Sequence, residues 1–337
     1  MDSMATVREV GERRLIELIM GVLTHMPSVP IPFWDDVSGL RLEGGRVAIL
    51  KTDMLVWRTD VPRGMTPFQA ARKVVVMNFS DLASKGVKPL AFMASLGIPP
   101  DMEVEAVLEM AKGFDSGSRE YGAYMIGGDT NEAGEVVIGG VAFGLVDEKV
   151  IMRRSGARPG DILATTGGFG KTAAAFKVLI GGYEAPRGFM ASILESVYMP
   201  KARVPEGLAL AETGAVSASI DSSDGLAMSL YDLSRSSHVG FRIDSLPASP
   251  EARKFGEVYG IELEELVFYG GEEYELVFTL RPELVEAARR ALKRVNCEMI
   301  EFGEVTEEIE ITYMEDGRKK PIKPLGWDHF RIISSSS

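Results

Sequence analysis

The chain has 337 residues, 45% of them hydrophobic, so it can bury a full core, and its size favours two domains over one. Its net charge of −12 argues against a nucleic-acid-binding surface, since phosphate backbones are held by an excess of Lys and Arg. Cys297 is the only cysteine, and we find neither a leader pattern nor an apolar run long enough to span a membrane, so we expect a cytoplasmic protein without disulfides.

The first half alternates helical and strand patterns. Apolar spacing predicts a helix over 7–23, and the run 46–50 predicts a strand that ends at the letters KTD. The letters TPFQ form a capping box with proline at the first helical position, which predicts a helix over 66–85, stopped by the next glycine. A short strand over 123–126 should end at GGDT, and a strand over 135–145 should be broken by its two glycines.

The second half repeats this alternation after a segment rich in Arg, Pro and Gly, where we place a domain boundary. The predicted domains are residues 1–150 and 151–337. A serine run over 334–337 is low in complexity and is predicted to be disordered. The mixture of strands and helices predicts α/β or α+β halves. We expect strands over 161–165 and 218–221 and a strand region over 268–280 that is interrupted by Gly270-Gly271. We expect helices that begin near 171, follow the letters SSD at 222–224 and span 282–295.

The stretch TTGGFGKT over 165–172 ends in the three letters that close a P-loop. A P-loop needs glycine at its first position, because that glycine lets consecutive N–H groups turn toward the phosphates. Thr165 stands there, so the motif fails. The favoured interpretation is a glycine turn between a strand and a helix, although a helix N-terminus can still assist an anion.

Aspartates follow short apolar runs repeatedly. Taken one at a time, most have an ordinary structural explanation, as a residue near a helix N-terminus or in a turn. Asp81 resists that explanation, because its helical neighbours have the character of a core and Asn78 lies one turn earlier on the same face. The full set comprises Asp35, Asp36, Asp53, Asp81, Asp129, Asp221 and Asp224.

If these carboxylates converge, their mutual repulsion requires cations. Two unit charges about 4 Å apart cost about 4 kcal/mol at an effective dielectric constant of about 20. Oxygen ligands without Cys or His suit Mg²⁺, and His25, His238 and His329 are too scattered to form a metal-binding pattern. Carboxylate-held Mg²⁺ normally bridges to substrate phosphates, which favours phosphoryl transfer, and no obvious nucleophile stands out. We therefore expect direct transfer rather than a covalent phosphoenzyme.

The ordered motifs resemble those of thiamine-monophosphate kinases, members of the superfamily that includes aminoimidazole ribonucleotide synthetase. The resemblance covers nearly the whole chain, from Asp35 to Phe330, and the motifs occur in the family order. Each motif alone is weak, but the ordered set is specific. The matching motifs are TDMLV (52–56), MNFSDLASKG (77–86), GGDT (127–130), RSGARPGD (154–161), DSSDGL (221–226), GGEEYEL (270–276) and GWDHF (326–330).

The resemblance implies a two-domain α/β homodimer, joined through its N-terminal domains, that transfers the γ-phosphoryl group of ATP to thiamine monophosphate with the help of several Mg²⁺ ions. Matching the motifs residue by residue implies a role for each of the following residues. The implied Mg²⁺ ligands are Asp36, Thr52, Asp53, Asp81, Asp129, Asp221 and Asp224, of which Asp81, Asp129 and Asp224 are also implied to be catalytic. The implied ATP contacts are Gly128, Asp129, Arg154 and Ser223, and the implied substrate-side residues are Asp60, Glu272 and Trp327.

Several positions depart from the family pattern or keep a second interpretation. Lys51 stands where many members have a small hydroxyl residue, which puts a metal contact there in doubt, and Asp60 falls about where many bacterial members carry a substrate-binding histidine. Glu272 has the alternative of pairing with a neighbouring Lys or Arg, and Trp327 that of ordinary C-terminal packing. Two other functions stay open: another ATP-using synthetase of the same superfamily, and a catalytically silent binder of nucleotide or thiamine phosphate.

Overall fold

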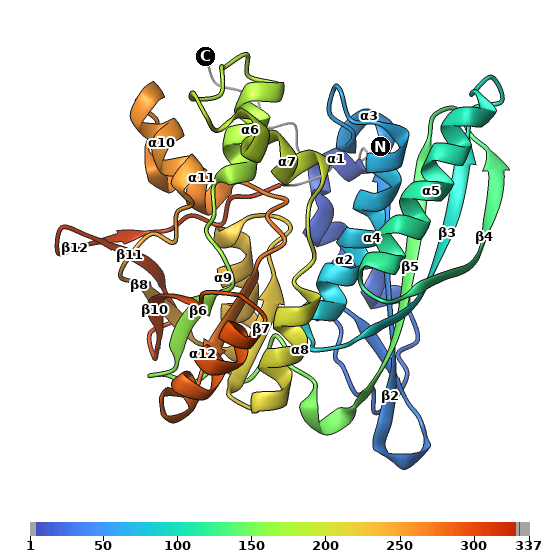
Figure 1. Cartoon of the computed structure of the whole chain (residues 1–337). Helices are drawn as coiled ribbons and strands as arrows, with labels where there is room; N and C mark the ends of the chain where they lie inside the picture. The colour runs from blue at the N-terminus through green and yellow to red at the C-terminus, as the bar shows by residue number, and fades with distance from the viewer. Residues whose placement is uncertain (1–4, 328–329, 331–337) are drawn as a thin grey trace.

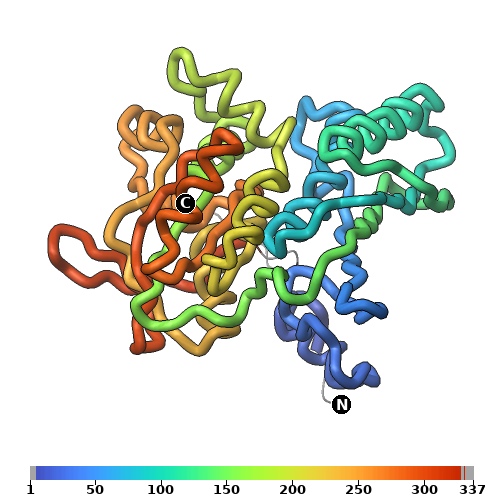
Figure 2. The backbone as a smooth tube through the Cα atoms, turned by 60° about the horizontal axis from the view of Figure 1, so that its bottom comes forward, coloured from blue at the N-terminus to red at the C-terminus, as the bar shows by residue number. Residues whose placement is uncertain are grey.

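Each half of the molecule is built around its own β-sheet, and the two halves lie side by side (Figures 1 and 2). The computed structural model describes residues 5–327 and 330. Within those residues, a five-stranded sheet has the order β1-β2-β5-β3-β4 and a seven-stranded sheet the order β12-β11-β8-β10-β6-β9-β7. The predicted α/β class with two sheet-containing halves is therefore confirmed.

The N-terminal half places two long helices against one face of its sheet, as Figure 1 shows for α4 and α5 beside β3, β4 and β5. Strand β3 is parallel to β4, and the other neighbouring pairs are antiparallel. The strands are β1 (Ser38–Arg41), β2 (Arg46–Val56), β3 (Pro89–Ile98), β4 (Tyr124–Glu132) and β5 (Val137–Asp147). The helices are α1 (Val7–Val10), α2 (Glu12–Val22), α3 (Trp57–Asp60), α4 (Pro67–Ser84) and α5 (Val104–Glu120).

Helix α4 follows its sequence signals closely. The Thr66 hydroxyl accepts from the N–H of Gln69, and the Gln69 side chain accepts from the N–H of Thr66, which completes the predicted capping box. The helix ends before Gly86, whose φ of 69° lies in the left-handed region that favours glycine. Nearly all of α4 is buried, because it packs on β2 and β5 on one side and on α8 and β7 of the other half on the other.

The N-terminal strands are longer than predicted. Strand β2 continues through the letters KTD to Val56, and β4 includes GGDT, because paired neighbours run alongside both segments. The predicted break at Gly139-Gly140 was wrong, since β5 is continuous. A Cβ on Gly140 would lie 2.6 Å from Asn78 Nδ2 and 2.8 Å from the Phe92 ring, so this glycine serves close packing under α4.

The helix predicted over 7–23 is divided into α1 and α2 at Gly11, whose φ is 76°. Neither piece has a fully buried residue, although Arg13 of α2 makes two hydrogen bonds to Asp232 of the other half, at 2.8 and 3.1 Å. The ion pair between Arg13 and Asp232 therefore connects this amphipathic segment to the C-terminal half.

The C-terminal half surrounds its sheet with shorter helices. The strand predicted over 268–280 was wrong in its first part, because Phe268 is in helix α11 and the strand begins at Leu276. The strands are β6 (Ile162–Thr165), β7 (Val216–Asp221), β8 (Gly240–Ile243), β9 (Leu276–Leu280), β10 (Ile300–Thr306), β11 (Ile311–Glu315) and β12 (Arg318–Pro321). The helices are α6 (Lys171–Leu179), α7 (Met190–Tyr198), α8 (Val204–Thr213), α9 (Leu226–Ser237), α10 (Pro250–Tyr259), α11 (Leu263–Tyr269) and α12 (Val285–Arg294).

The largest hydrophobic cluster is continuous across the two halves. It joins Phe79 and Leu82 of α4 to Leu210 of α8 and to Phe278 of β9. The two sheets are therefore held by a shared apolar core, which fixes α4 between them. No helix among the described residues is long and apolar enough to cross a bilayer. The serine run predicted to be disordered lies outside the described residues.

Candidate active site

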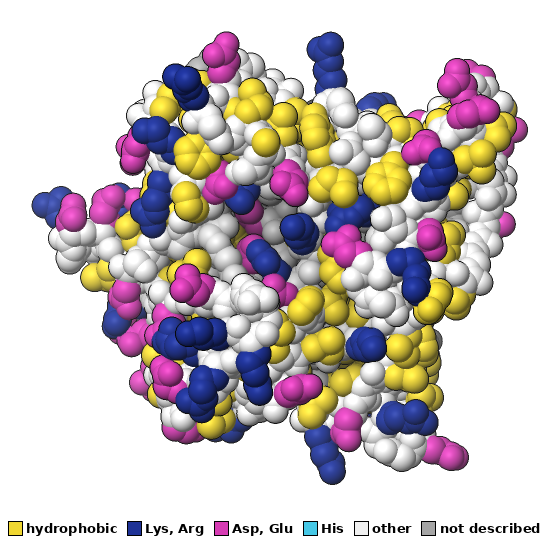
Figure 3. Space-filling view, viewed as in Figure 1, with side chains coloured by type: hydrophobic (Ala, Val, Ile, Leu, Met, Phe, Trp, Pro, Cys, Tyr) yellow, Lys and Arg dark blue, Asp and Glu magenta, His cyan; other side chains and the backbone are white. Residues whose placement is uncertain are grey.

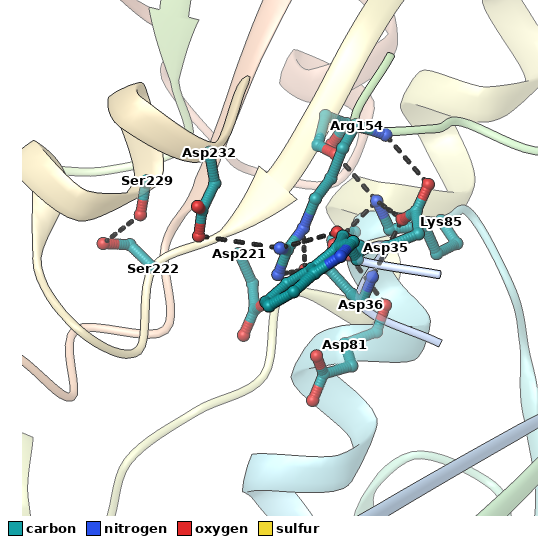
Figure 4. A network of polar contacts seen from close by, with 12 residues as sticks. Asp35, Asp36, Asp81, Lys85, Arg154, Asp221, Ser222, Ser229 and Asp232 are labelled. Atoms are coloured by element: carbon teal, nitrogen blue, oxygen red, sulfur yellow. Dashed lines mark hydrogen bonds and ion pairs between the residues drawn. The ribbon is translucent and has the colours of Figure 1, made fainter. Parts of the chain in front are cut away.

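Three aspartates from distant parts of the sequence meet beside α4. Asp36 comes from the loop before β1, Asp81 from α4 and Asp221 from the last position of β7. Each offers a carboxylate oxygen within 4.8 Å of the others, and all three residues are more than 90% buried. Figure 4 shows them on the side of α4 that faces the C-terminal half. We call these residues the three-carboxylate group.

Serine side chains of α4 orient two members of this group. The Ser80 hydroxyl donates to Asp221 at 2.7 Å, and the Ser84 hydroxyl donates to Asp36 at 2.8 Å. Residues 80, 81 and 84 lie on one side of a helix, because 3.6 residues make a turn. One surface of α4 thus contributes a ligand and holds two others, which explains why this helix is polar in the middle of a core.

Two cations neutralise one end of the three-carboxylate group. Lys85 Nζ lies 2.7 Å from Asp35 Oδ1 and 2.6 Å from Asp36 Oδ2, and the Lys85 side chain has no exposed surface. The guanidinium of Arg154 also pairs with Asp36 and donates to the carbonyl of Trp34. Burial alone would raise the pKa of Asp36, but Arg154 and Lys85 outweigh burial and hold it below its usual value.

The other two carboxylates remain under-compensated. Burial, together with the charges of neighbouring aspartates, raises the pKa of Asp81 well above its usual value. Burial and the charge of Asp36 raise the pKa of Asp221 to about 7. Because both shifts report unfavourable negative charge, the group has room for further positive charge. An all-oxygen donor set in this arrangement fits a hard divalent cation such as Mg²⁺.

Lys51 supplies the only close protein cation on that side among the described residues. Its Nζ atom lies 3.1 Å from Asp53 Oδ1 and 3.1 Å from Asp81 Oδ1. Burial opposes protonation of Lys51, but Asp53, Asp81 and Asp221 outweigh burial, so the pKa of the ammonium group is raised. Lys51 and Asp53 face the cleft together because they are two residues apart on β2. In Figure 3, acidic and basic side chains gather in the hollow between the halves.

The structure does not bring every predicted ligand to this group. Thr52 is exposed, lies on the opposite face of β2 from Asp53, and donates its hydroxyl to the Gly140 carbonyl at 2.8 Å. Cross-strand pairing connects Asp53 of β2 through β5 and β3 to Gly128 of β4. Because neighbouring strands are about 4.8 Å apart, these three steps place Asp53 and Gly128 roughly 14 Å apart. Asp129, next to Gly128, is exposed on β4.

Four other predicted residues, Ser223, Asp224, Glu272 and Trp327, lie where the DSSDGL loop meets the GGEEYEL loop. The Glu272 N–H donates to the Ser223 carbonyl at 2.6 Å, and the Trp327 N–H donates to the Asp224 carbonyl at 3.3 Å. Ser223 is exposed, and Trp327 is 50% exposed. These residues form a rim beside Asp221, at the start of α9.

Glu272 pairs with a lysine, as the alternative interpretation allowed. Its Oε1 atom accepts from Lys73 Nζ at 2.6 Å, and the same ammonium donates to the Asp60 carbonyl at 3.0 Å. The Asp60 carboxylate itself accepts from the N–H of Val56 at 2.7 Å. Lys73 therefore gathers two predicted substrate-side residues from opposite halves around one buried cation.

The glycine stretch 165–172 forms the predicted turn between β6 and α6. Its helix N-terminus already has an acceptor, because the Glu273 carboxyl group accepts from the N–H groups of Gly170 at 2.6 Å and Thr172 at 3.1 Å. Burial raises the pKa of Glu273 to about 7. A protein carboxylate thus takes the position that a phosphate would need, which agrees with the failed P-loop motif.

Neither of the two histidines that the structure describes contacts the three-carboxylate group in a hydrogen bond or ion pair. His25 Nε2 lies 2.9 Å from the Met20 carbonyl, and His238 ends α9 in the left-handed region. His329 lies outside the described residues. Sequence reasoning missed Lys85 and Lys73, which contact site residues and are almost fully buried. A signal was present, since both are charged residues within or next to a helix with a core-like composition.

Fold and site together define an AIR synthase related protein. The N-terminal domain of that family matches residues 34–146 and the C-terminal domain matches residues 158–314. Within this class, the chain belongs to the thiamine-monophosphate kinase family. It is 37% identical to the thiamine-monophosphate kinase of Pyrococcus horikoshii, over 88% of this chain and 90% of that protein. The corresponding enzyme of Nitrosopumilus maritimus is 36% identical, over 88% of this chain and 93% of that protein.

A solved structure of AaThiL complexed with AMPPCP and TMP has the same fold. It matches this chain with a TM-score of 0.84 and 27% sequence identity, and the match covers 97% of this chain and all of that one. The solved thiamine-monophosphate kinase of Aquifex aeolicus matches with a TM-score of 0.77 and 26% identity, over 91% of this chain and 97% of that one. Both domains therefore correspond to those of solved kinases.

Proposed function

We propose that this protein phosphorylates thiamine monophosphate to thiamine diphosphate with ATP, using divalent cations held by buried aspartates. The observation that carries the proposal is the three-carboxylate group, in which Asp81 and Asp221 lack the protein cations that neutralise Asp36. A site with excess negative charge cannot bind polyphosphate unless cations are added. This geometry, in a chain related to thiamine-monophosphate kinases, favours Mg²⁺-assisted phosphoryl transfer.

The residues that would hold Mg²⁺ are Asp36, Asp81 and Asp221, with Asp53 beside them. Bound there, Mg²⁺ would neutralise the phosphates of ATP and of the acceptor. Thr52, Asp129 and Asp224 remain proposed ligands from the motif match. These side chains would contact metal ions that the bound nucleotide brings close to them, or they would complete the metal site of a second subunit.

The protein's own groups would position the reactants. Arg154 and Lys85 fix the loop that contains Asp36, because they bind its carboxylate from two sides. Gly128 and Ser223 would contact ATP, and Arg154 would reach its phosphates with the part of its side chain that remains exposed. On the substrate side, Glu272 would face the cationic thiazolium ring, since its Oε2 atom is buried without a hydrogen-bond partner. Trp327 offers a half-exposed aromatic face for stacking, and Asp60 lies beside Glu272 through Lys73.

The reaction itself needs little covalent chemistry from the protein. An oxygen of the acceptor phosphate attacks the γ-phosphorus of ATP in line, the bond from that phosphorus to the β,γ-bridging oxygen breaks, and ADP leaves. Because the acceptor phosphate is largely ionised near neutral pH, no general base is needed. Catalysis then comes from positioning and charge neutralisation.

The test is an assay that measures two products. Purified protein would be incubated with ATP, Mg²⁺ and thiamine monophosphate, and thiamine diphosphate and ADP would be measured by chromatography. We expect equal amounts of both products, and neither with thiamine as acceptor. ADP formation that depends on an aminoimidazole-pathway substrate would instead indicate another synthetase of the superfamily. Nucleotide binding without turnover would indicate a silent regulator.

We also propose that the protein is a homodimer joined through the open face of its N-terminal sheet. Helices α4 and α5 cover one face, while the other exposes large apolar side chains from β2, β3 and β4. Such a patch is typical of a protein–protein interface. The exposed residues include Leu50, Met54, Met93, Tyr124 and Ile126.

Light scattering during size-exclusion chromatography tests this interface. We expect the wild type to have twice the 36.7 kDa mass of one chain. The double substitution Met54→Glu and Ile126→Glu should produce a monomer, because dimer formation would then bury two charges from each chain. Ile180→Glu is the matched control, since Ile180 is 77% exposed and follows α6 in the other half. A monomeric wild-type protein would contradict the proposal.

We propose a cytoplasmic location, on the basis of the single buried cysteine. The domain boundary at residue 150 also remains a proposal. It falls in the connection between β5, which ends at Asp147, and β6, which begins at Ile162.

A further inference from the structure

Lys51 lies in a position that the proposed function does not explain. Its ammonium bridges Asp53 of β2 and Asp81 of α4, with both nitrogen–oxygen distances at 3.1 Å. The three side chains are only 20%, 25% and 10% exposed. Asp81 also belongs to the three-carboxylate group, so one carboxylate faces two places where positive charge is favourable.

An ammonium and a divalent ion cannot share the space between Asp53 and Asp81. Magnesium requires carboxylate oxygens at about 2.0–2.1 Å in a near-octahedral arrangement. The Lys51 nitrogen instead lies about 1 Å farther from each carboxylate oxygen than a magnesium ion would. Its N–H groups occupy the space between the two carboxylates and exclude a metal ion. While the lysine bridges the pair, Asp53 can contribute to a metal site only with an oxygen that faces away from the ammonium.

Lys51 is also well held in this place. It lies two residues from Asp53 on the same face of β2, and its ammonium is drawn by Asp221 as well as by its two direct partners. A lysine available to bind a phosphate would instead need an ammonium that is not already paired with two carboxylates. The contacts therefore favour a role as a permanent counter-ion over a role as a phosphate ligand.

We propose that the Lys51 ammonium takes the place of one divalent cation between Asp53 and Asp81, so that this chain binds one ion fewer than it would with a neutral residue 51. The inference rests on the proposed function in one respect only, that divalent cations bind among these carboxylates. Lys51 is then a positioning residue that holds Asp81 in place without a metal ion. Asp36, Asp81 and Asp221 remain available to bind the divalent cation that contacts the phosphates.

The test counts bound Mn²⁺ by electron paramagnetic resonance in the full-length protein without nucleotide. Lys51→Met retains most of the side-chain volume and removes the charge, whereas Lys51→Arg retains the charge. We expect Lys51→Met to bind one more Mn²⁺ per chain than the wild type, because removal of the ammonium leaves Asp53 and Asp81 free to bind an ion. Lys51→Arg should resemble the wild type.

A second substitution locates the added ion. Asp53→Asn in the Lys51→Met background should return the Mn²⁺ count to that of the wild type, because the added site would lose a ligand. Lys177→Met is the matched control, since it breaks an exposed lysine pair, with Glu265 at 2.7 Å, in the other half. Circular dichroism and melting curves show whether each variant is folded. Should Lys51→Met lose its fold, Lys51→Gln would replace it in the same measurement.

Equal Mn²⁺ counts in the wild type and Lys51→Met would overturn the inference, as would no Mn²⁺ binding to either protein. Its failure is distinguishable from failure of the proposed function. Equal counts in a protein that still forms thiamine diphosphate reject only the role of Lys51. An added ion in Lys51→Met, with no thiamine diphosphate from the wild type, supports the role of Lys51 and rejects the kinase.

Discussion

Two groups of carboxylates lie next to each other beside α4 and differ in how they are neutralised. In the first, Asp35 and Asp36 meet Lys85 and Arg154, so two negative charges face two positive charges. In the second, Asp53, Asp81 and Asp221 share one ammonium, and the pKa values of Asp81 and Asp221 are raised.

We call the first set of residues the matched group, because its charges balance, and the second set the unmatched group. We infer a structural role for the matched group and a chemical role for the unmatched group. The matched group joins α4 to the loop before β1 and to the segment after β5, and Lys85 also donates to the Ser219 carbonyl of β7 at 2.7 Å. Such a group needs no ligand to be stable. In the unmatched group, repulsion between the carboxylates remains until a cation binds. A metal-dependent phosphoryl-transfer site requires this property, because the repulsion favours metal binding.

The largest expected effect comes from breaking the matched group. Lys85→Met would leave Asp35 and Asp36 buried with too little positive charge, which should lower the free energy of unfolding by about 3–5 kcal/mol. Urea denaturation followed by circular dichroism measures this change. Lys254→Met, which removes an exposed pair with Glu257, is the control and should change stability by less than about 1 kcal/mol. Similar losses in both variants would contradict the structural role of the matched group.

Next in size is the effect of Asp81→Asn on turnover. The substitution removes a ligand from the unmatched group and should lower kcat by about 10²–10³-fold, or about 3–4 kcal/mol. Without divalent ions its melting temperature should not fall, because the repulsion that raises the pKa of Asp81 is removed. Kinase assays and metal-free melting curves test the two halves of this prediction. A variant that turns over normally, or that melts far below the wild type, would argue for a purely structural Asp81.

The smallest effect concerns Glu273, a carboxyl group that accepts from two N–H groups at the N-terminus of α6. Its pKa is raised to about 7 by burial, so between about pH 4.5 and pH 7 the folded chain keeps a proton that the unfolded chain releases. The free energy of unfolding should therefore fall as pH rises through this window. Because the residue is only partly buried, we expect the fall to be about 1–2 kcal/mol.

Glu273→Gln should remove this part of the pH dependence. Urea midpoints measured between pH 4.5 and pH 7.5 would show a smaller slope in the variant than in the wild type. Glu257→Gln, at an exposed position, provides the comparison. Parallel curves for all three proteins would mean that the helix N-terminus keeps Glu273 ionised throughout the range.

The sequence by itself determined much of this protein. Local signals fixed α4 from its capping box to Gly86, excluded a P-loop at residue 165 and identified the family from ordered motifs. They also put forward seven aspartates, Asp36, Asp81 and Asp221 among them, although only Asp81 resisted an ordinary structural explanation. These features depend on residues close together in the chain, where helix capping, turn geometry and side-chain periodicity act.

Only the tertiary structure decided which aspartates meet and which cations they meet. Pairing with neighbouring strands carried β2 and β4 past their predicted ends, which placed Thr52 and Asp129 on strands, away from the three-carboxylate group. Likewise, Lys51, Lys73 and Lys85 acquired their partners only when α4 packed between the two sheets. Electrostatic energies depend on distance and burial in space, so a linear sequence reveals the charges but not their balance.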